Sequence, residues 1–412
     1  MNKPVFETAL PANYALDTML LGVAVGIEPS DNDERIANKR YQLLEKVLQR
    51  PKGILKQYLL DHTSSIYAQG SFASGTLIVS GEKDDRFDVD AILQFSPPIS
   101  YTPKLILDVL HHDLQGFPGA IEIERCTRCI QVRFPQMHLD VTPLVPPAVL
   151  GTPSYGEICH SPDEGRDYYV PAHPKGAADW YRGQMGSSPL DFYASQLTLA
   201  RSQYSVDRLS ALTDAEKASV EPLPETTSTR SDDLRVIAVK LLKRHLRKIY
   251  RELGLKRPPS IYVTILSGYL PQAQIGVADE LIRLADLVKN DVITRLTTSL
   301  TNPAYAPDII TDRWPGSHKD VSVLTQVLNT FIGKLTLLKT ADLKVIQATL
   351  SELFGERVAT SVVKQNFQHL ANSGDVGVNQ DGALFDINSA PKPVLAAPYI
   401  KPKPNTFHCG KI

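Results

Sequence analysis

The nonapeptide FDVDAILQF, residues 87–95, constrains the fold of this chain more than any other segment. Its apolar side chains recur at every second position, and in an extended strand such positions share one face of the sheet. That spacing buries one face of the strand and places Asp88 and Asp90 side by side on the other. We therefore predict a strand whose polar face carries two carboxylates.

Two further elements accompany this strand. Asp140, in the segment HLDVTPL, stands between Leu139 and Val141, so it too faces away from the buried side of a predicted strand. Upstream, Gly70 and Ser71 predict a turn of small residues. Glycine lets backbone amides approach a phosphate closely, and a serine hydroxyl can donate a hydrogen bond to it.

The three acids together predict a metal-dependent site. Adjacent carboxylates repel each other unless a cation neutralises them, and oxygen ligands favour Mg²⁺. Asp88, Asp90 and Asp140 on neighbouring strands can hold two such ions roughly 3.5–4 Å apart, which activates an attacking hydroxyl and stabilises a leaving oxygen. With the Gly70–Ser71 turn, they predict transfer of a nucleotidyl group from a nucleoside triphosphate to a hydroxyl, releasing pyrophosphate.

Each element also has a simpler interpretation. A strand bearing D-x-D can be a solvated face without a metal, and a Gly-Ser turn can be only a turn. The enzymatic interpretation is favoured because three separated elements indicate the same chemistry. A catalytically inactive binding module with the same fold stays open as a distant alternative.

Length and composition limit the classes of protein that this chain can represent. Its 412 residues exceed one ordinary compact core and suffice for two lobes. The formal net charge of -1 gives no strong sign of nucleic-acid binding, and four cysteines fit a reducing compartment. The most apolar early segment, residues 18–27, is too short to span a bilayer. We expect a soluble, cytoplasmic protein with no membrane contact.

The apolar pattern changes character along the chain. A helix capped by Ser30 precedes residues 60–145, which read as a twisted antiparallel or mixed sheet with flanking helices, and in which IEIERCTRCIQVRF is expected to be one strand. An irregular connection is expected at 146–190 and a linker or exposed loop at 204–232.

The second half of the chain is expected to be mostly helical. A helix capped by Ser231 and stopped by Gly254 opens it, and further helices are expected at 278–296, 319–339 and 341–371. Four basic residues lie at helical neighbour spacings on the first of these helices: Lys240, Lys243, Arg244 and Arg247. They form either a solvated face or a clamp for phosphates.

Other candidates have weaker signals. Cys126-x-x-Cys129, followed by Cys159-His160, suggests zinc, but structural zinc sites need four well-placed ligands and buried thiols beside a hairpin are the simpler interpretation. Aromatic residues of the irregular connection either stack on a nucleobase or belong to the core. These aromatic residues are Tyr155, Tyr168, Tyr169, Trp180 and Tyr181.

The motifs GSFASGT, FDVDAIL and LDVTPLVP resemble those of polymerase-β-like nucleotidyltransferases. The later segments ICHSPDEGRDYYVPAHPKGAADWY and AVKLLKRHLRKIYRELGLKRPPSIYVTIL resemble more closely the CD-NTase family, the cyclic-oligonucleotide synthases of bacterial antiphage signalling. The resemblance covers residues 15–370. It implies an α+β fold, with a nucleotidyltransferase lobe and spine helix at 1–200, a helical lobe at 201–371, a cleft between them, and a Pro/Gly-rich tail at 372–412.

The resemblance also implies roles for individual residues. Gly70 and Ser71 would hold the triphosphate. Asp88 and Asp90 would bridge two Mg²⁺ ions, for which Mn²⁺ can substitute, and Asp140 would bind the ion nearest the attacking ribose hydroxyl. The remaining contacts to donor phosphates would come from the helical lobe, through Lys240 or Lys243 together with Ser260.

The activity implied by the resemblance is the joining of nucleoside triphosphates into a cyclic di- or trinucleotide second messenger for antiphage defence. The alternative is a non-cyclising nucleotidyltransferase that acts on RNA, a protein or a small molecule. Some family members attach partner proteins through the C-terminal end, so the tail is a candidate attachment point for effector or regulatory proteins. Here Gly410 is followed by Lys411 and Ile412, so the chain lacks a terminal glycine.

Overall fold

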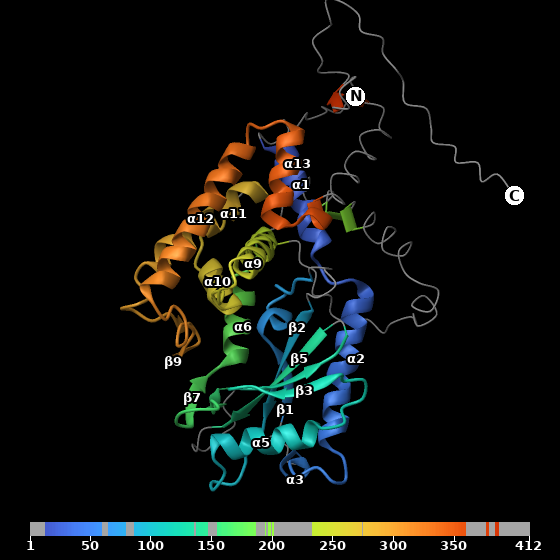
Figure 1. Ribbon diagram of the computed structural model, residues 1–412, viewed down its shortest axis with the longest axis vertical. Coiled ribbons are helices and arrows are strands. Elements are labelled where there is room, and N and C mark those ends of the chain that lie inside the picture. The colour runs from blue at the N-terminus through green and yellow to red at the C-terminus, as the bar shows by residue number, and fades with distance from the viewer. Residues whose placement is uncertain are drawn as a thin grey trace, which may run out of the picture.

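A computed structural model arranges the chain as a sheet-based part and a helical part, stacked along the long axis (Figure 1). The described residues are 13–59, 65–79, 86–135, 137–146, 155–186, 194, 197–198, 200–201, 233–273, 275–359, 376–378 and 384–386. The predicted linker at 204–232 lies outside them, as does the predicted tail apart from two short strands, β10 (Val376–Val378) and β11 (Leu384–Asp386).

The sheet-based part is built on a seven-stranded mixed sheet. Five strands lie in the order β1-β2-β5-β4-β3, and β6 and β7 extend the sheet from β5. Only β2 and β5 pair in parallel among these described strands; the other neighbours are antiparallel. The strands are β1 (Ser65–Gln69), β2 (Phe87–Gln94), β3 (Glu122–Arg125), β4 (Ile130–Arg133), β5 (Met137–Val145), β6 (Gly156–His160) and β7 (Tyr168–Ala172).

Two helices cover the apolar face of this sheet. α2 (Asp31–Leu48) and α5 (Pro103–Leu114) contribute to one buried core with Phe87, Val89 and Leu93 of β2, the alternate residues that the sequence pattern placed inside. The acids lie on the opposite face, which also carries a small buried cluster that includes Ile92 of β2 and Leu144 of β5. The α+β fold with a mixed sheet and flanking helices is confirmed. Shorter helices in this part are α3 (Lys56–Leu59), α4 (Gly70–Ala73) and α6 (Pro174–Gly183).

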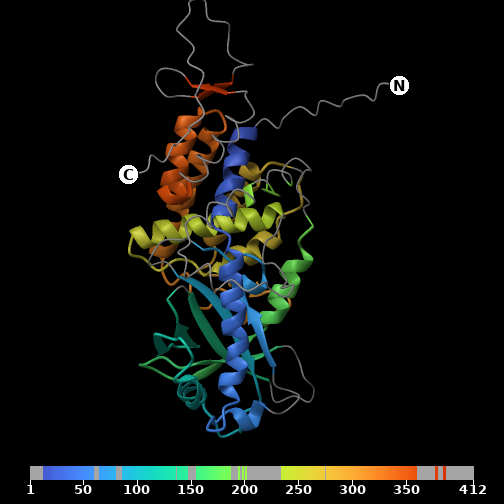
Figure 2. The ribbon, with the colours of Figure 1, turned by 90° about the vertical axis from the view of Figure 1, so that its right-hand side faces the viewer.

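The two parts share a helical spine. α1 (Tyr14–Gly26) is buried in the helical part and α2 runs beside the sheet, so that the pair follows the length of the molecule in Figure 2. Ser30 starts α2 as predicted: its hydroxyl accepts from the Asp33 backbone N–H, while the Asp33 carboxylate accepts from the Ser30 N–H. This reciprocal cap fixes where the spine bends.

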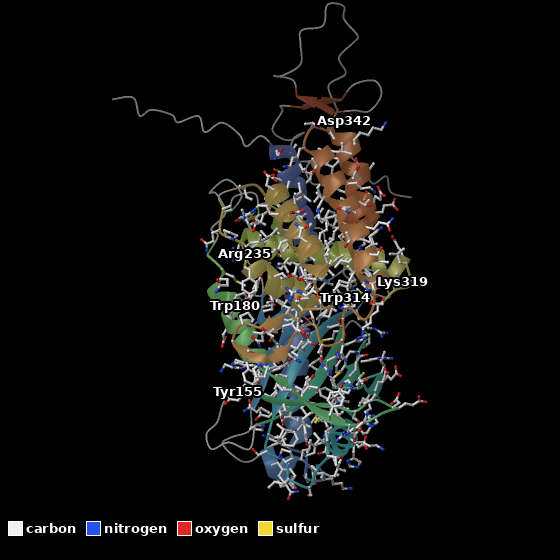
Figure 3. All side chains as sticks on the ribbon, turned by 90° about the vertical axis from the view of Figure 1, so that its left-hand side faces the viewer. Tyr155, Trp180, Arg235, Trp314, Lys319 and Asp342 are labelled. Atoms are coloured by element: carbon white, nitrogen blue, oxygen red, sulfur yellow. The ribbon has the colours of Figure 1, made fainter. Side chains whose placement is uncertain are left out.

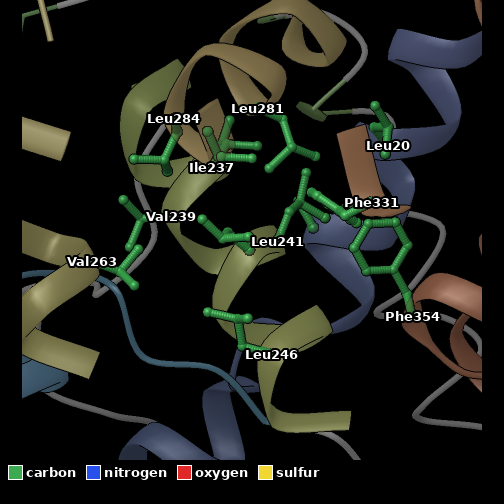
Figure 4. Packing of buried hydrophobic residues seen from close by; sticks show 14 of the residues in the cluster. Leu20, Ile237, Val239, Leu241, Leu246, Val263, Leu281, Leu284, Phe331 and Phe354 are labelled. Carbon is green, nitrogen blue, oxygen red and sulfur yellow. The ribbon is translucent and has the colours of Figure 1, made fainter. Parts of the chain in front are cut away.

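The helical part is organised around α9 (Leu234–Glu252). Figure 4 shows Ile237 and Leu241 of this helix among Leu281 of α11, Leu20 of α1 and Phe331 of α12. Because α9 is surrounded, nearly its whole circumference is buried. The other elements of this part are α10 (Ser260–Gly268), α11 (Val277–Val292), the hairpin of β8 (Thr301–Asn302) and β9 (Tyr305–Ile309), α12 (His318–Leu338) and α13 (Leu343–Phe354).

Three predictions of secondary structure are corrected. The residue that caps α9 is Asp233, whose side chain accepts from two backbone N–H groups; Ser231 lies outside the described residues. The connection predicted as irregular at 146–190 contains β6, β7 and α6. The segment IEIERCTRCIQVRF is a hairpin of two strands, closed by a hydrogen bond from the Cys126 N–H to the Cys129 carbonyl.

The helix predicted at 341–371 is interrupted: residues 356–359 are helical again after Gly355, and residues 360–371 lie outside the described residues. α13 ends at Phe354, because Gly355 adopts φ 104°, a conformation that does not continue a helix. By length and apolar composition alone, α12 is the one described helix able to cross a membrane. Five of its apolar side chains are buried in the core of the helical part: Leu324, Leu328, Phe331, Leu335 and Leu338.

Candidate active site

One row of polar residues crosses five strands of the sheet. Gln69 of β1 pairs with Asp90 of β2, Asp90 with Asp140 of β5, Asp140 with Gln131 of β4, and Gln131 with Glu124 of β3. Residues directly opposite each other in neighbouring strands point to the same face, with strands about 4.8 Å apart. The register therefore sets Asp90 and Asp140 next to each other.

A second row lies two residues further along and on the same face. Asp88 pairs with His138 of β5, and His138 pairs with Arg133 of β4. His138 Nδ1 is 3.4 Å from Asp88 Oδ1. Since alternate residues of a strand share a face, Asp88 projects beside Asp90, and the three acids converge on one surface.

The acids repel each other strongly in this arrangement. Burial and the charges of Asp140 and Asp88 raise the pKa of Asp90 to about 8. Burial also raises the pKa of Asp140 to about 6, although a hydrogen bond from Gln131 opposes the shift. Without a cation Asp90 keeps a proton near neutral pH, and a bound cation would release it.

Asp88 behaves differently because basic groups face it. Burial acts to raise the pKa of Asp88, but the hydrogen bond from His138 and the charges of Arg247 and Arg257 outweigh it and lower this pKa. Arg247 is on α9, and Arg257 is in the connection to α10. The helical part thus presents positive charge to the acids of the sheet, as binding of a triphosphate requires.

The Gly70–Ser71 turn is fitted closely against Asp90. Gly70 follows the end of β1 and begins α4 with φ 60°, a left-handed conformation that favours glycine. A Cβ at Gly70 would lie 2.2 Å from Asp90 Oδ2. Two features therefore require glycine at position 70: the left-handed backbone angle and the close approach of the Asp90 carboxylate.

The residues predicted to reach over from the helical part have distinct surroundings. Lys243 is buried and donates to the carbonyl of Thr76 at 2.7 Å and to its hydroxyl at 3.2 Å, just after α4. Burial and the charge of Arg257 lower the pKa of Lys243 to about 7. Ser260 is the first residue of α10, a helix that contacts α4. Lys243 thus reaches the segment that follows α4, and Ser260 belongs to a helix that packs against α4.

Lys240 has another environment. Its ammonium is fully buried and lies 3.0 Å from Oε1 of Glu28, at the bend of the spine, where Arg201 also pairs with Glu28. This triad ties α9 to the spine. The predicted contact of Lys240 with a nucleotide stays a prediction, as do the roles assigned to the other site residues.

The donor set suits Mg²⁺. The three converging side chains offer only oxygen, and the repulsion that raises the pKa of Asp90 is relieved by a cation. Among the described residues, no group of three or more His, Cys, Asp or Glu is already gathered as a metal site. Sites of this kind are commonly completed by substrate phosphates and water, so a closed protein cage is not required.

The weaker candidates mostly contact other protein groups. Tyr155 stacks on Tyr305 with ring centroids 4.7 Å apart, and Trp180 packs against Tyr269. Figure 3 shows Tyr155 and Trp180 at successive heights along one edge of the molecule. Tyr181 is fully buried. The core interpretation of these three side chains is therefore favoured over base stacking.

The sequence pattern did not single out three residues at the site. His138 and Gln131 contact Asp88 and Asp140, and Arg257 acts on Asp88 and Asp90. His138 carried a usable signal, since it stands two residues before Asp140 on the same strand and so shares its face. Gln131 stands between apolar Ile130 and Val132, so alternation also places it on the polar face, but nothing in the sequence pairs it with Asp140. Arg257 carried no signal.

The fold and the converging acids define a nucleotidyltransferase. Comparison with known families shows which nucleotidyltransferases this chain resembles. Residues 19–184 match the profile described as Second Messenger Oligonucleotide or Dinucleotide Synthetase domain. The chain carries this domain, and the resemblance to the CD-NTase family is confirmed.

Individual proteins are similar over nearly the whole chain. The cyclic dinucleotide synthase CdnG of Bradyrhizobium diazoefficiens is 27% identical over 94% of this chain and 92% of its own. A solved structure of CdnG with GTP has a TM-score of 0.69 at 26% identity and covers 86% of this chain and 99% of its own. The cyclic AMP-GMP synthase DncV of Vibrio cholerae shares the fold at 13% identity and a TM-score of 0.50, covering 85% and 88%.

Proposed function

We propose that this nucleotidyltransferase joins nucleoside triphosphates into a cyclic di- or trinucleotide. The observation that carries the proposal is the convergence of Asp88, Asp90 and Asp140 on one face, with Gly70 packed against Asp90. The similarity to CdnG, a cyclic dinucleotide synthase, supports cyclisation as the outcome.

The side chains divide the work between binding and proton transfer. Backbone amides of the Gly70–Ser71 turn hold the triphosphate, and Arg247 and Arg257 offset its charge from the helical part. Asp88, Asp90 and Asp140 would hold two Mg²⁺ ions, which supply charge neutralisation at the phosphates and lower the pKa of the attacking hydroxyl.

The reaction has two similar steps. The ribose hydroxyl oxygen of one nucleotide forms a bond to the α-phosphorus of another, the bond from that phosphorus to its bridging oxygen breaks, and pyrophosphate leaves. Asp140 takes up the proton of the hydroxyl. The linear intermediate then reacts again through its own free hydroxyl, which closes the ring and releases a second pyrophosphate.

The biological setting follows from the same resemblance. We place the enzyme in the cytoplasm, as a source of a second messenger for antiphage defence, with effector or regulatory proteins as partners. The lobes are assigned to residues 1–200 and 201–371, with α1 of the first packed into the second, and residues 372–412 are proposed as the tail through which partners attach. Phage plating on the native host with the wild-type gene or with Asp90→Asn in its place tests this setting; equal plaque counts would contradict it.

Product analysis tests the enzymatic proposal. The protein is incubated with all four labelled triphosphates and Mg²⁺, treated with phosphatase, and analysed by mass spectrometry. A small, phosphatase-resistant product supports cyclisation. Label on RNA or protein, or a linear product only, would favour the non-cyclising alternative. If no labelled product forms, and if Asp140→Asn keeps wild-type cellular function, the binding module is favoured.

A further inference from the structure

The edge hairpin of the sheet, β3 and β4, reaches into the active site through one side chain. Gln131 of β4 is the direct strand partner of Asp140, and its Nε2 donates to Asp140 Oδ1 at 2.9 Å. This contact involves only one oxygen of the carboxylate. The acid assigned to the attacking hydroxyl is therefore held by a neutral donor from the neighbouring strand.

The orientation of the Gln131 amide is fixed from its other end. Nε of Arg133 donates to Gln131 Oε1 at 2.7 Å. A guanidinium has only donors, so the amide oxygen has to face Arg133 and the amide NH₂ has to face Asp140. The reversed amide would set donor against donor at Arg133 and acceptor against acceptor at Asp140.

Arg133 is in turn held by two carboxylates of the edge strand. Its NH1 donates to Glu122 at 2.7 Å, and its NH2 donates to Glu124. All four residues follow the strand register, in which Glu122 pairs with Arg133 and Glu124 with Gln131. A continuous chain of hydrogen bonds thus runs from the outer edge of the sheet to Asp140.

This series of hydrogen bonds limits how the Asp140 carboxylate can rotate. The carboxylate torsion of an aspartate is broad and roughly two-fold, so an untethered Asp140 samples many orientations. The Gln131 bond restricts that rotation and leaves Oδ2 outside the contact. A cationic donor at the same place would compete with a bound metal for the carboxylate charge, whereas the amide orients it without doing so.

We propose that Gln131 is a positioning residue for nucleotidyl transfer, which aims the Asp140 carboxylate at the attacking hydroxyl, and that Arg133 acts through Gln131 by fixing its amide. The inference rests on the proposed function, in which Asp140 serves that hydroxyl. It predicts a defect in the chemical step, because Gln131 and Arg133 hold a catalytic carboxylate.

A double-mutant cycle tests the proposal by pyrophosphate release. Gln131→Leu is expected to lower kcat by about 10–100-fold with KM for nucleotide unchanged, as for other groups that orient a metal ligand. Arg133→Gln is expected to lower kcat in the wild type and to have no further effect in Gln131→Leu. The proposal would be overturned if the double variant lost kcat by the product of the two single-variant losses, or if only KM changed.

A control variant separates positioning from damage to the hairpin. Arg125 of β3 pairs with Asp108 and donates to Ser161, so Arg125→Gln also removes a charged anchor from this hairpin but leaves Gln131 and Asp140 in contact. Its kcat is expected to match that of the wild type. A loss as large as that of Gln131→Leu would assign the effect to hairpin integrity and overturn the proposal.

A second readout needs neither metal nor nucleotide. In ¹⁵N-glutamine NMR spectra of the protein, the side-chain amide signal lost in Gln131→Leu is expected to shift in both Asp140→Asn and Arg133→Gln. An unmoved signal would overturn the inference. If Gln131→Leu keeps full kcat while Asp140→Asn is inactive, only the positioning role fails; if Asp140→Asn is fully active, the proposed function fails with it.

Discussion

Replacing Gly70 with alanine tests how closely the phosphate turn is fitted to the acid-bearing strand. The left-handed φ of 60° costs an alanine about 1–2 kcal/mol. The added Cβ would lie 2.2 Å from Asp90 Oδ2 and 3.0 Å from Asp90 Cγ, while Cβ contacts under 3.0 Å are essentially absent from proteins. The carboxylate oxygen therefore has to withdraw by about 0.8 Å.

That displacement acts on a group that has to be aligned with the phosphates. A misplacement of about 1 Å in a catalytic constellation can cost about 10²-fold in rate. We expect Gly70→Ala to lower kcat by about that factor, measured as pyrophosphate release at saturating nucleoside triphosphate and Mg²⁺. Thermal unfolding of the same variant reports the backbone cost separately.

Gly254 provides a matched control. It also adopts a left-handed conformation, φ 63°, at the end of α9, but a Cβ there meets nothing within 4 Å. Gly254→Ala should therefore lose a similar amount of stability and keep the wild-type kcat. The reasoning is refuted if Gly70→Ala keeps the wild-type rate, or if the two variants lose activity equally.

Three further predictions follow from the electrostatics. The raised pKa of Asp90, about 8, means that the metal-free folded state holds a proton that the unfolded state releases near pH 4. The Tm of the metal-free protein should therefore fall as pH rises from about 4 to 8. A Tm that falls as steeply in Asp90→Asn would contradict this. Arg257→Gln should raise KM for nucleoside triphosphate by about tenfold or more, through loss of a charge-assisted contact, and an unchanged KM would exclude Arg257 from the site. Lys240→Met should lower the free energy of unfolding by about 3 kcal/mol, because Glu28 loses a buried partner, and should leave KM unchanged; a raised KM with full stability would instead support nucleotide contact.

The sequence was most informative where the pattern is local. Alternation in β2 predicts which face carries Asp88 and Asp90, and a single acid between apolar neighbours places Asp140 on the same kind of face. Ser30 at the start of α2 was likewise recognisable as a cap, because its partner stands three residues away. In each case a strand or helix period fixes the geometry.

Non-local features could not be predicted in this way. Lys240 and Lys243 are three residues apart on one helix, so periodicity places them together, yet one meets Glu28 of the spine and the other meets Thr76. Arg257 belongs to a short connection whose approach to the acids depends on how the two parts of the molecule pack. The turn at Cys126–Cys129 contains neither glycine nor proline, which is why the hairpin was predicted as one strand.

The central claim is that three carboxylates on one face perform the transfer. Pyrophosphate release by Asp88→Asn, Asp90→Asn and Asp140→Asn tests it most directly, with Asp286→Asn on the exposed side of α11 as a control for the same chemical change. The account predicts that each active-site variant loses about 10³-fold or more in kcat while Asp286→Asn matches the wild type. Near-wild-type turnover in any one of the three would contradict it.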